Sequence, residues 1–427
     1  MDGPDLDGRP LDVVLFGASG FVGRLVADYL ARSAGPTVRV GLAGRSQDRL
    51  ERLRADLGPA AADWDVLVAD AGDPAALERL ARATRVVATT VGPYTRRGLP
   101  LVQACAENGT GYVDLTGEVL FMRDSADRFH DTARSTGARI VHACGFDSVP
   151  SDLAVRRTAE RARADGEGRL RHTTLLVRSL AGGVSGGTID SMRVQVDAAR
   201  DPANRRVIAD PYALSPDRSA EPEAGDQRDA ARPFREVMTG TWAAPFPMAG
   251  VNTRVVRRSN ALQEWRYGRG LRYRELVACG TGPRGAARAA LLTLGLGAAV
   301  VGMAVPPVRW VLDRVLPAPG DGPDEETRRS GSFRLEVQAR TTTGARYRTT
   351  FAAQGDPGYA ATAVMFGESA LALALDGDRL PAGAGVLTPA TALGDVLDAR
   401  LRAAGVQITT ERVGAEERQG TRSPSGP

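Results

Sequence analysis

The chain has 427 residues, a formal charge of +4 and 43% hydrophobic residues, values that fit a packed protein of about two domains. All 55 basic side chains are arginine because the sequence contains no lysine, which excludes Schiff-base lysine chemistry, a P-loop lysine and a Tyr-x-x-x-Lys pair. The three cysteines and three histidines form no cluster, so we expect no metal site.

The two ends of the chain are predicted to be disordered. The opening "MDGPDLDGRP" is polar and lacks the apolar core of a signal peptide. The end of the chain is rich in charged residues, glycine and proline. We therefore expect disorder at residues 1–10 and 411–427. Isolated cysteines fit a reducing compartment, which predicts a cytoplasmic protein.

Short apolar strands alternate with helical patterns between residues 11 and 160. This alternation predicts right-handed βαβ units and an N-terminal Rossmann domain, a doubly wound parallel sheet covered on both faces. The expected strands are "DVVLFG", "VRVGLAG", "WDVLVAD", "RVVATTVG", "GYVDL" and "RIVHACG", and the expected helices are 21–32, 46–57, 74–82, 97–108 and 119–136.

The first strand is followed by the glycine-rich stretch "GASGFVG", which opens the first helix. In such a loop Gly17 permits a sharp turn, Gly20 lets the backbone approach a pyrophosphate, and Gly23 lets helix and strand pack closely. The amino end of the helix offers N–H groups to phosphates. The pattern predicts a dinucleotide site, the alternative being a turn that holds no ligand. The other loop residues expected at the cofactor are Ser19, Phe21 and Val22.

The second strand ends in "LAGRS" and carries no carboxylate. An NAD-preferring chain has Asp or Glu at this place to hold the ribose hydroxyl. Here Arg45 and Ser46 follow, and a guanidinium can bind a phosphate through two parallel hydrogen bonds. We therefore predict NADP(H) as the cofactor. The alternative for Arg45 is a solvated surface arginine.

Two further strand ends belong to the predicted site, because ligands bind beyond the carboxyl ends of parallel strands. Asp70 follows the third strand, where it could meet the adenine or instead serve as a carboxylate at a helix start. Thr90, Val91 and Gly92 follow the fourth strand and are expected beside the nicotinamide ribose.

The alternation stops after about residue 165, and a second, α+β domain on a mixed or antiparallel sheet is expected over residues 161–384. Residues 385–410 are a candidate for returning to the first domain. The expected strands are "TTLLVRSL", "TRVVRRSNAL", "FRLEVQARTT" and "ARYRTTFAAQ"; the expected helices are 187–200, 285–305, 358–375 and 390–403; and the expected long loops are 201–236 and 317–330.

The longest apolar run is "AALLTLGLGAAVVGMAVPP", residues 289–307. It lies at the short edge of the length that a membrane span needs. Arg284 and Arg288 precede it and Arg309 follows it. Three interpretations stay open: a buried helix of the second domain, a helix that rests on a bilayer or lines an apolar tunnel, and a true span.

Several motifs together resemble the saccharopine dehydrogenase-like oxidoreductases, and more closely their bacterial branch of trans-acting enoyl reductases. The resemblance rests on "GASGFVG", "LAGRS", "TTVGPYTRRGLPLVQACAENGTGYVDLTGE", "CGFDSVPSDLA", "SGGTIDS", "VVRRSNAL", "GDPGYAATAVMFGESALALA" and "GVLTPATALGDVL". It implies an NADP-binding Rossmann domain, an α+β domain, and reduction of a carbon–carbon double bond in a polyketide or fatty-acyl chain during lipid or glycolipid synthesis.

That reaction needs a group that polarises the thioester carbonyl and a proton source for the α-carbon. The candidates near the strand ends are Tyr94, Asp147 and Ser148. The alternatives are a packed aromatic for Tyr94 and a helix cap for the other two. Asp114 and Glu118 are weaker candidates, with an ion pair or a cap as the alternative, and His142 is expected in the core.

The leading hypothesis is thus an NADPH-dependent oxidoreductase, an enoyl reductase for lipid-type acyl substrates. The alternatives are an imine- or amino-acid-forming dehydrogenase and a non-catalytic NADP-binding, membrane-associated scaffold. The partners considered are a carrier-bound or free acyl substrate, an acyl carrier or polyketide synthase, the inner face of the plasma membrane, and a second copy of the chain. No basic–aromatic stripe is present, so we expect no nucleic-acid partner.

Overall fold

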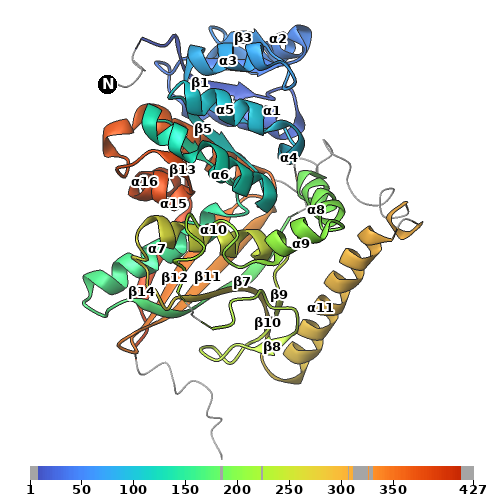
Figure 1. The fold of residues 1–427 in the computed structure, drawn as a ribbon, viewed down its shortest axis with the longest axis vertical. Helices are drawn as coiled ribbons and strands as arrows, with labels where there is room; N and C mark the ends of the chain where they lie inside the picture. The colour runs from blue at the N-terminus through green and yellow to red at the C-terminus, as the bar shows by residue number, and fades with distance from the viewer. Residues whose placement is uncertain are drawn as a thin grey trace, which may run out of the picture.

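The computed structural model describes residues 8–182, 186–222, 225–305, 307–310, 326 and 330–414. It contains two seven-stranded sheets, one in the upper half of Figure 1 and one in the lower half. The first is parallel throughout and the second is mixed, so the predicted doubly wound domain with a second α+β unit is confirmed.

The first sheet has the order β13-β6-β5-β4-β1-β2-β3, and each pair in it is parallel. Val13 of the central strand lies opposite Val40 on one side and Val86 on the other. The strands are β1 (Leu11–Phe16), β2 (Val40–Gly44), β3 (Asp65–Val68), β4 (Thr84–Thr89), β5 (Gly111–Asp114), β6 (Arg139–Val141) and β13 (Gly385–Leu387).

Helices cover both faces of this sheet, because successive side chains of a strand point to opposite sides. Val13 and Leu15 join one core, and Val14 and Phe16 join the other. The first core is covered by α1 (Phe21–Ser33), α2 (Gln47–Asp56) and α14 (Ala360–Leu375), and the second by α3 (Pro74–Ala83), α5 (Leu99–Glu107) and α6 (Val119–Thr136). Two short helices, η1 (Gly58–Ala61) and α4 (Tyr94–Arg97), lie in the connections.

The second sheet has the order β14-β12-β11-β7-β10-β9-β8. Its pairs are antiparallel except β7 with β10. The strands are β7 (Leu170–Ala181), β8 (Phe234–Arg235), β9 (Trp242–Pro245), β10 (Arg272–Gly280), β11 (Ser332–Thr341), β12 (Arg346–Gln354) and β14 (Gln407–Arg412). The accompanying helices are α7 (Val149–Ala164), α8 (Gly186–Ala198), α9 (Pro202–Ala209), α10 (Ala249–Leu262), α11 (Gly282–Ala304), α15 (Pro389–Ala392) and α16 (Gly394–Ala403), with the short η2 (Gly377–Arg379).

The last part of the chain contributes to both sheets. β13 extends the first sheet by pairing with β6, whereas β14 pairs with β12 in the second. α14 packs on α1 and on strands β1, β4 and β5. α14 and α1 approach each other closely at Gly367, where a Cβ would lie only 2.5 Å from the ring of Tyr29. The Tyr29 hydroxyl donates a hydrogen bond of 2.5 Å to Glu368.

The stretch "TRVVRRSNAL", expected as a strand, forms the last ten of the 14 residues of helix α10, so that prediction is wrong. Val251 and Val255 lie one helical turn apart and are both buried. The arginines can also be buried, because their head groups bind backbone carbonyl oxygens. Arg257 donates to Tyr273 O, and Arg258 donates to Leu214 O and Val386 O.

Other differences concern loops and ends. The expected loop 201–236 contains α9 and β8, and sequence reasoning missed β9 and β10. Arg9, expected in a disordered segment, is buried and donates to the carbonyl oxygens of Ala81 and Thr84. Glu411 and Arg412, expected in the disordered tail, end β14. Residues 1–7 and 415–427 and most of 317–330 lie outside the described residues.

Replacing Arg258 by methionine is expected to lower the free energy of unfolding by about 2–6 kcal/mol, because two buried carbonyl oxygens lose their donor and each costs about 1–3 kcal/mol. Burial already lowers the pKa of Arg258 to about 10. Urea denaturation measures the effect. The exposed Arg266 on the loop after α10 gives the control, since Arg266→Met is expected to change stability little.

Candidate active site

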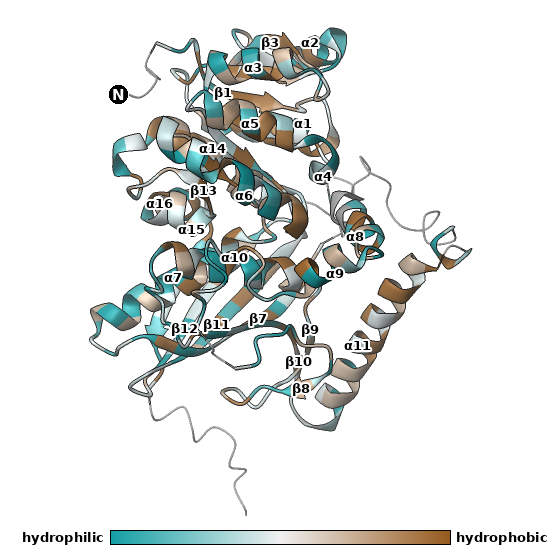
Figure 2. Ribbon diagram, in the orientation of Figure 1, coloured by the Kyte–Doolittle hydropathy of each residue, from teal (hydrophilic) through white to brown (hydrophobic). Residues whose placement is uncertain are grey.

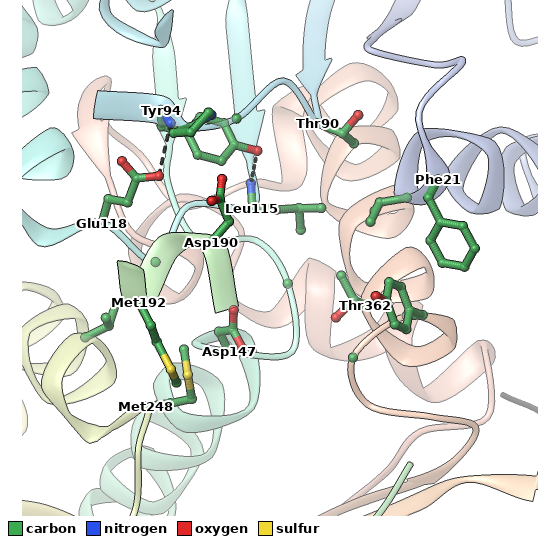
Figure 3. A pocket seen from close by; sticks show the side chains of 18 of the residues that line it. Phe21, Thr90, Tyr94, Leu115, Glu118, Asp147, Asp190, Met192, Met248 and Thr362 are labelled. Atoms are coloured by element: carbon green, nitrogen blue, oxygen red, sulfur yellow. Dashed lines mark hydrogen bonds between the residues drawn. The ribbon is translucent and has the colours of Figure 1, made fainter. Parts of the chain in front are cut away.

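A cavity of about 300 Å³ lies where the carboxyl ends of β1, β4, β5 and β6 meet helices from the second half of the chain (Figure 3). The sheet contributes the loops that follow these four strands. α8, the start of α10 and the loop before α14 close the opposite side. The cavity therefore lies between the two sheets, at the edge where doubly wound folds bind ligands.

The glycine loop has the geometry of a phosphate cradle. Gly17 has a φ of +91°, which favours glycine, and a Cβ there would lie 2.7 Å from Thr90 Oγ1. A Cβ at Gly23 would lie 2.2 Å from the carbonyl oxygen of Gly17. Gly20 is the N-cap of α1, and no side chain caps that helix. Gly20, Phe21, Val22 and Gly23 all line the cavity, so the amino end of α1 faces it.

The loop after β4 is tied to the glycine loop. Thr90 N donates to Phe16 O at 2.9 Å, and Thr90 Oγ1 donates to Gly17 O at 3.2 Å. Thr90 and Gly92 line the cavity. Val91 packs against the glycine loop instead. Its Cγ2 lies so near Gly17 that a Cβ on Gly17 would be only 2.8 Å away. The structure thus brings these predicted residues together with the three glycines.

The residues predicted to read the adenosine end lie outside the cavity lining. Arg45 is exposed directly after β2, beside Ser46 at the start of α2. A Cβ at Gly44 would lie 3.8 Å from Ser19 Oγ, which places Ser19 close to the end of β2. Asp70 is exposed and accepts a hydrogen bond of 2.7 Å from Gly72 N. The carboxylate that caps α3 is Asp73, so the helix-start alternative for Asp70 does not hold.

Asp147 is the acidic residue best placed for proton transfer. It lines the cavity and follows β6, and Figure 3 shows its carboxylate pointing into the cavity. Across the described residues, its carboxylate makes no hydrogen bond or ion pair. Burial raises the pKa of Asp147 to about 6. A carboxyl group with this pKa is protonated in about one molecule in ten at pH 7, far more often than an ordinary aspartic acid.

Tyr94, predicted as a donor, uses its hydroxyl elsewhere. The hydroxyl donates to Thr89 O at 3.1 Å and accepts from Leu115 N at 3.2 Å. It therefore joins the ends of β4 and β5 (Figure 3). Burial, followed by the charge of Asp114, raises its pKa well above the ordinary value. The ring lines the cavity, but the proton is held by a backbone carbonyl, so this geometry fits a positioning residue.

Ser148 does not reach the cavity. It is fully buried and donates to Asn252 Oδ1 at 3.0 Å, which joins α7 to α10. Asn252 also donates to Glu275 at 2.9 Å, and Tyr273 donates to the same carboxyl at 2.7 Å. The Ser148 side chain makes no capping hydrogen bond to α7. Its predicted catalytic role is therefore replaced by a buried link between helices.

The weaker candidates have structural partners. Glu118 accepts from Tyr94 N at 3.0 Å and from Thr95 N at 2.7 Å, so it caps α4 as the alternative proposed. Asp114 and Ser125 bind the two ring nitrogens of His142, each at 2.7 Å. These three side chains are between 0% and 4% exposed. This chain of hydrogen bonds is closed to substrates, and His142 is a core residue as expected.

Sequence reasoning expected the helix start in "SGGTIDSM" at the cleft but named none of the described residues on the far wall of the cavity. Asp190, Met192 and Gln195 come from α8, and Gln195 donates to Gly117 O at 3.0 Å. Met248 stands at the start of α10, and Thr362 of α14 accepts a hydrogen bond from Phe146 N at 3.2 Å. Only the fold brings these segments to the strand ends, so no local signal marks them.

Comparisons with known proteins agree with this geometry. Residues 13–141 match the saccharopine dehydrogenase NADP binding domain. A Mycobacterium tuberculosis protein named as a trans-acting enoyl reductase is 52% identical over 414 residues, which cover 95% of this chain and 98% of that protein. A trans-acting enoyl reductase of Mycobacterium bovis is 50% identical over 420 residues, covering 95% and 99%. The solved apo saccharopine dehydrogenase (L-Glu forming) of Saccharomyces cerevisiae is 16% identical, with a TM-score of 0.53 and coverage of 94% of this chain and 99% of that one.

Proposed function

The chain belongs to the trans-acting enoyl reductase family and carries a saccharopine dehydrogenase-type NADP-binding domain, and from this premise we propose that it reduces the α,β-double bond of a lipid or polyketide acyl thioester. The coarser activity, an NADP-dependent oxidoreductase, follows from the family itself. The substrate class is the proposed part.

The substrate class is inferred from the ionisable side chains that line the cavity. Glu118, Asp147 and Asp190 are the ionisable acids in the described lining, which contains no arginine or histidine. A substrate with its own carboxylates, such as an amino acid, would find no cation in this lining to pair with. Leu115, Met192 and Met248 add apolar surface. A neutral acyl thioester suits this wall better than the amino-acid dehydrogenase alternative does.

The residues of the chain divide the reaction between them. NADPH, when bound, supplies the hydride that adds to the β-carbon and breaks the π bond. The amino end of α1 and the glycine cradle would hold the pyrophosphate. Asp147 gives its proton to the α-carbon, which completes the saturated thioester and leaves a carboxylate that takes a new proton from water. Tyr94 holds the ends of β4 and β5 together at the wall of the cavity.

The source of the substrate extends the same proposal. A thioester of this kind is delivered on an acyl carrier or by a polyketide synthase. We place the reaction in the cytoplasm, where a thioester-linked chain and NADPH occur together. The three cysteines are buried and unpaired, as a reducing compartment requires.

The direct test is NADPH oxidation by the purified protein with 2-enoyl thioesters of N-acetylcysteamine of increasing chain length. We expect consumption of NADPH and a saturated thioester product. The contrast is a 2-oxo acid offered with an amine, which should give no oxidation. NADPH oxidation with the 2-oxo acid and amine, but not with the enoyl thioesters, would replace this proposal by the imine dehydrogenase alternative. Binding of NADPH without turnover of either substrate would favour the scaffold.

Arg45 is expected to decide between the two nicotinamide cofactors. Replacing it by glutamine should weaken NADPH binding about 10- to 100-fold and leave NADH binding unchanged, because a charge-assisted pair of hydrogen bonds to the phosphate contributes roughly 1.5–3 kcal/mol. Fluorescence titration with both nucleotides measures this. The exposed Arg79 on α3 serves as the matched control. Equal loss for both nucleotides would show that Arg45 does not read the phosphate.

A further inference from the structure

Helix α11 presents an uncovered apolar surface. Leu291 and Leu294 are each 72% exposed, Val301 is 62% exposed, and Trp310 just beyond the helix is 61% exposed. Figure 1 shows α11 along the outer side of the second sheet, and Figure 2 shows its hydrophobic colouring. Isolated exposed apolar residues are ordinary, but a continuous row of them marks an interaction surface.

A row of exposed apolar residues runs along one side of the helix, and Leu292 and Val300 on its other sides are 42% and 46% exposed. Leu291, Leu294, Ala298 and Val301 follow one another at spacings of three or four residues and are all exposed. Helical geometry puts such positions on one side. The buried Gly285, Ala289 and Met303 lie on the opposite side, and the helix packs against β9 and β10. The outward face is therefore fixed by the fold.

The helix is long and apolar enough to cross a membrane by length and composition. Its two ends, however, are held on the same side of the protein. Its first residue is two positions after the end of β10, and Arg309, just past its last residue, donates to Asp197 of α8 at 2.6 Å. A crossing helix would have to release one of these attachments. The geometry favours a helix lying on a surface.

Charge identifies the surface. From Thr281 to Trp310 the sequence contains no Asp or Glu, whereas Arg284 and Arg288 are exposed at the start of the helix. Arginines beside an apolar face bind anionic lipid headgroups, and tryptophan is favoured at the membrane interface. A second copy of the chain would bring the same arginines and no carboxylate from this face to pair with them. The charges thus favour a bilayer over a dimer.

We propose that α11 docks the protein on the surface of an anionic lipid bilayer. α11 contacts α8, and α8 lines the cavity with Asp190 and Met192. A bilayer beneath α11 therefore lies one helix away from the cavity, where an apolar acyl chain would enter. The docking depends on α11 alone and stands whether or not the substrate proposal holds.

The test is flotation of the full-length protein with vesicles made of phosphatidylglycerol and phosphatidylcholine in equal parts, or of phosphatidylcholine alone. We expect binding to the anionic vesicles that weakens at high salt. The double substitution Leu291→Glu with Leu294→Glu should reduce binding about tenfold or more. The matched control replaces two exposed apolar residues elsewhere, Val237→Glu with Leu375→Glu, and should bind as the unmodified protein does.

Two results would overturn the proposal. The first is an unmodified protein that fails to bind anionic vesicles. The second is a dimer in sedimentation that becomes a monomer in the α11 variant without any vesicle binding, which would assign the face to a second copy. NADPH titration of each variant confirms that it is folded. Reduction of a soluble enoyl thioester is measured separately, so loss of docking and loss of activity are distinguished.

Discussion

Replacing Asp147 by asparagine is expected to reduce kcat for an enoyl thioester by about 100- to 10,000-fold, the range typical of a lost general acid. NADPH affinity should be unchanged, because Asp147 lies beyond β6 and not in the glycine cradle. The thermal midpoint should not fall, since the carboxylate forms no hydrogen bond among the described residues. Steady-state kinetics, nucleotide titration and thermal unfolding together test this.

The dependence of kcat on pH gives a second test of the role of Asp147. Burial raises the pKa of Asp147 to about 6, and a general acid acts in its protonated form. The rate constant kcat should therefore be level below pH 6 and fall as the pH rises above 6. Asp147→Asn should remove this dependence from the residual rate. Asp190→Asn, in the same cavity, is the comparison, and loss of the pH profile in that variant alone would assign the proton to Asp190.

Replacing Gly23 by alanine is expected to weaken NADPH binding at least about 100-fold and to lower the free energy of unfolding by about 1–3 kcal/mol. The new Cβ would lie 2.2 Å from Gly17 O and 2.8 Å from Ala18 O. Both are backbone atoms, so α1 must move away from the loop, and its amino end leaves the cavity. Fluorescence titration and urea denaturation measure the two effects.

The control for this substitution is Gly270→Ala. A Cβ at Gly270 would meet no atom within 4 Å, so binding and stability should change little. Unchanged NADPH affinity in Gly23→Ala would mean that the cofactor does not rest on the amino end of α1.

The parts of the fold that could be predicted are those encoded by neighbouring residues. The turn at Gly17 and the start of α1 follow from seven consecutive residues, and the alternation of strands and helices follows from local periodicity. The strand prediction for Val255 and Val256 failed because β-branched residues favour strands only when tertiary contacts agree. Those contacts here are carbonyl oxygens from distant loops that bind Arg257 and Arg258.

The candidate site likewise contains residues that local sequence predicts and residues that only distant segments bring into place. Asp147 could be named from the sequence because it follows a strand of the parallel sheet. The burial of Ser148 could not, since it depends on Asn252 more than 100 positions later. Met248 and Thr362 reach the cavity only through the path of the chain between the two sheets. The cofactor side of the site is thus local in sequence, whereas the substrate side is assembled from distant segments.

The packing of α14 and β13 on the first sheet bears on how the protein is made. Strands β1 to β6 are translated before residue 150, but one of the three helices that cover one of their faces, α14, spans Ala360–Leu375, and the last strand of their sheet ends at Leu387. Until then α1 and α2 cover only part of that apolar sheet face. The sheet and the covering of the nucleotide-binding half are therefore completed only near the end of translation.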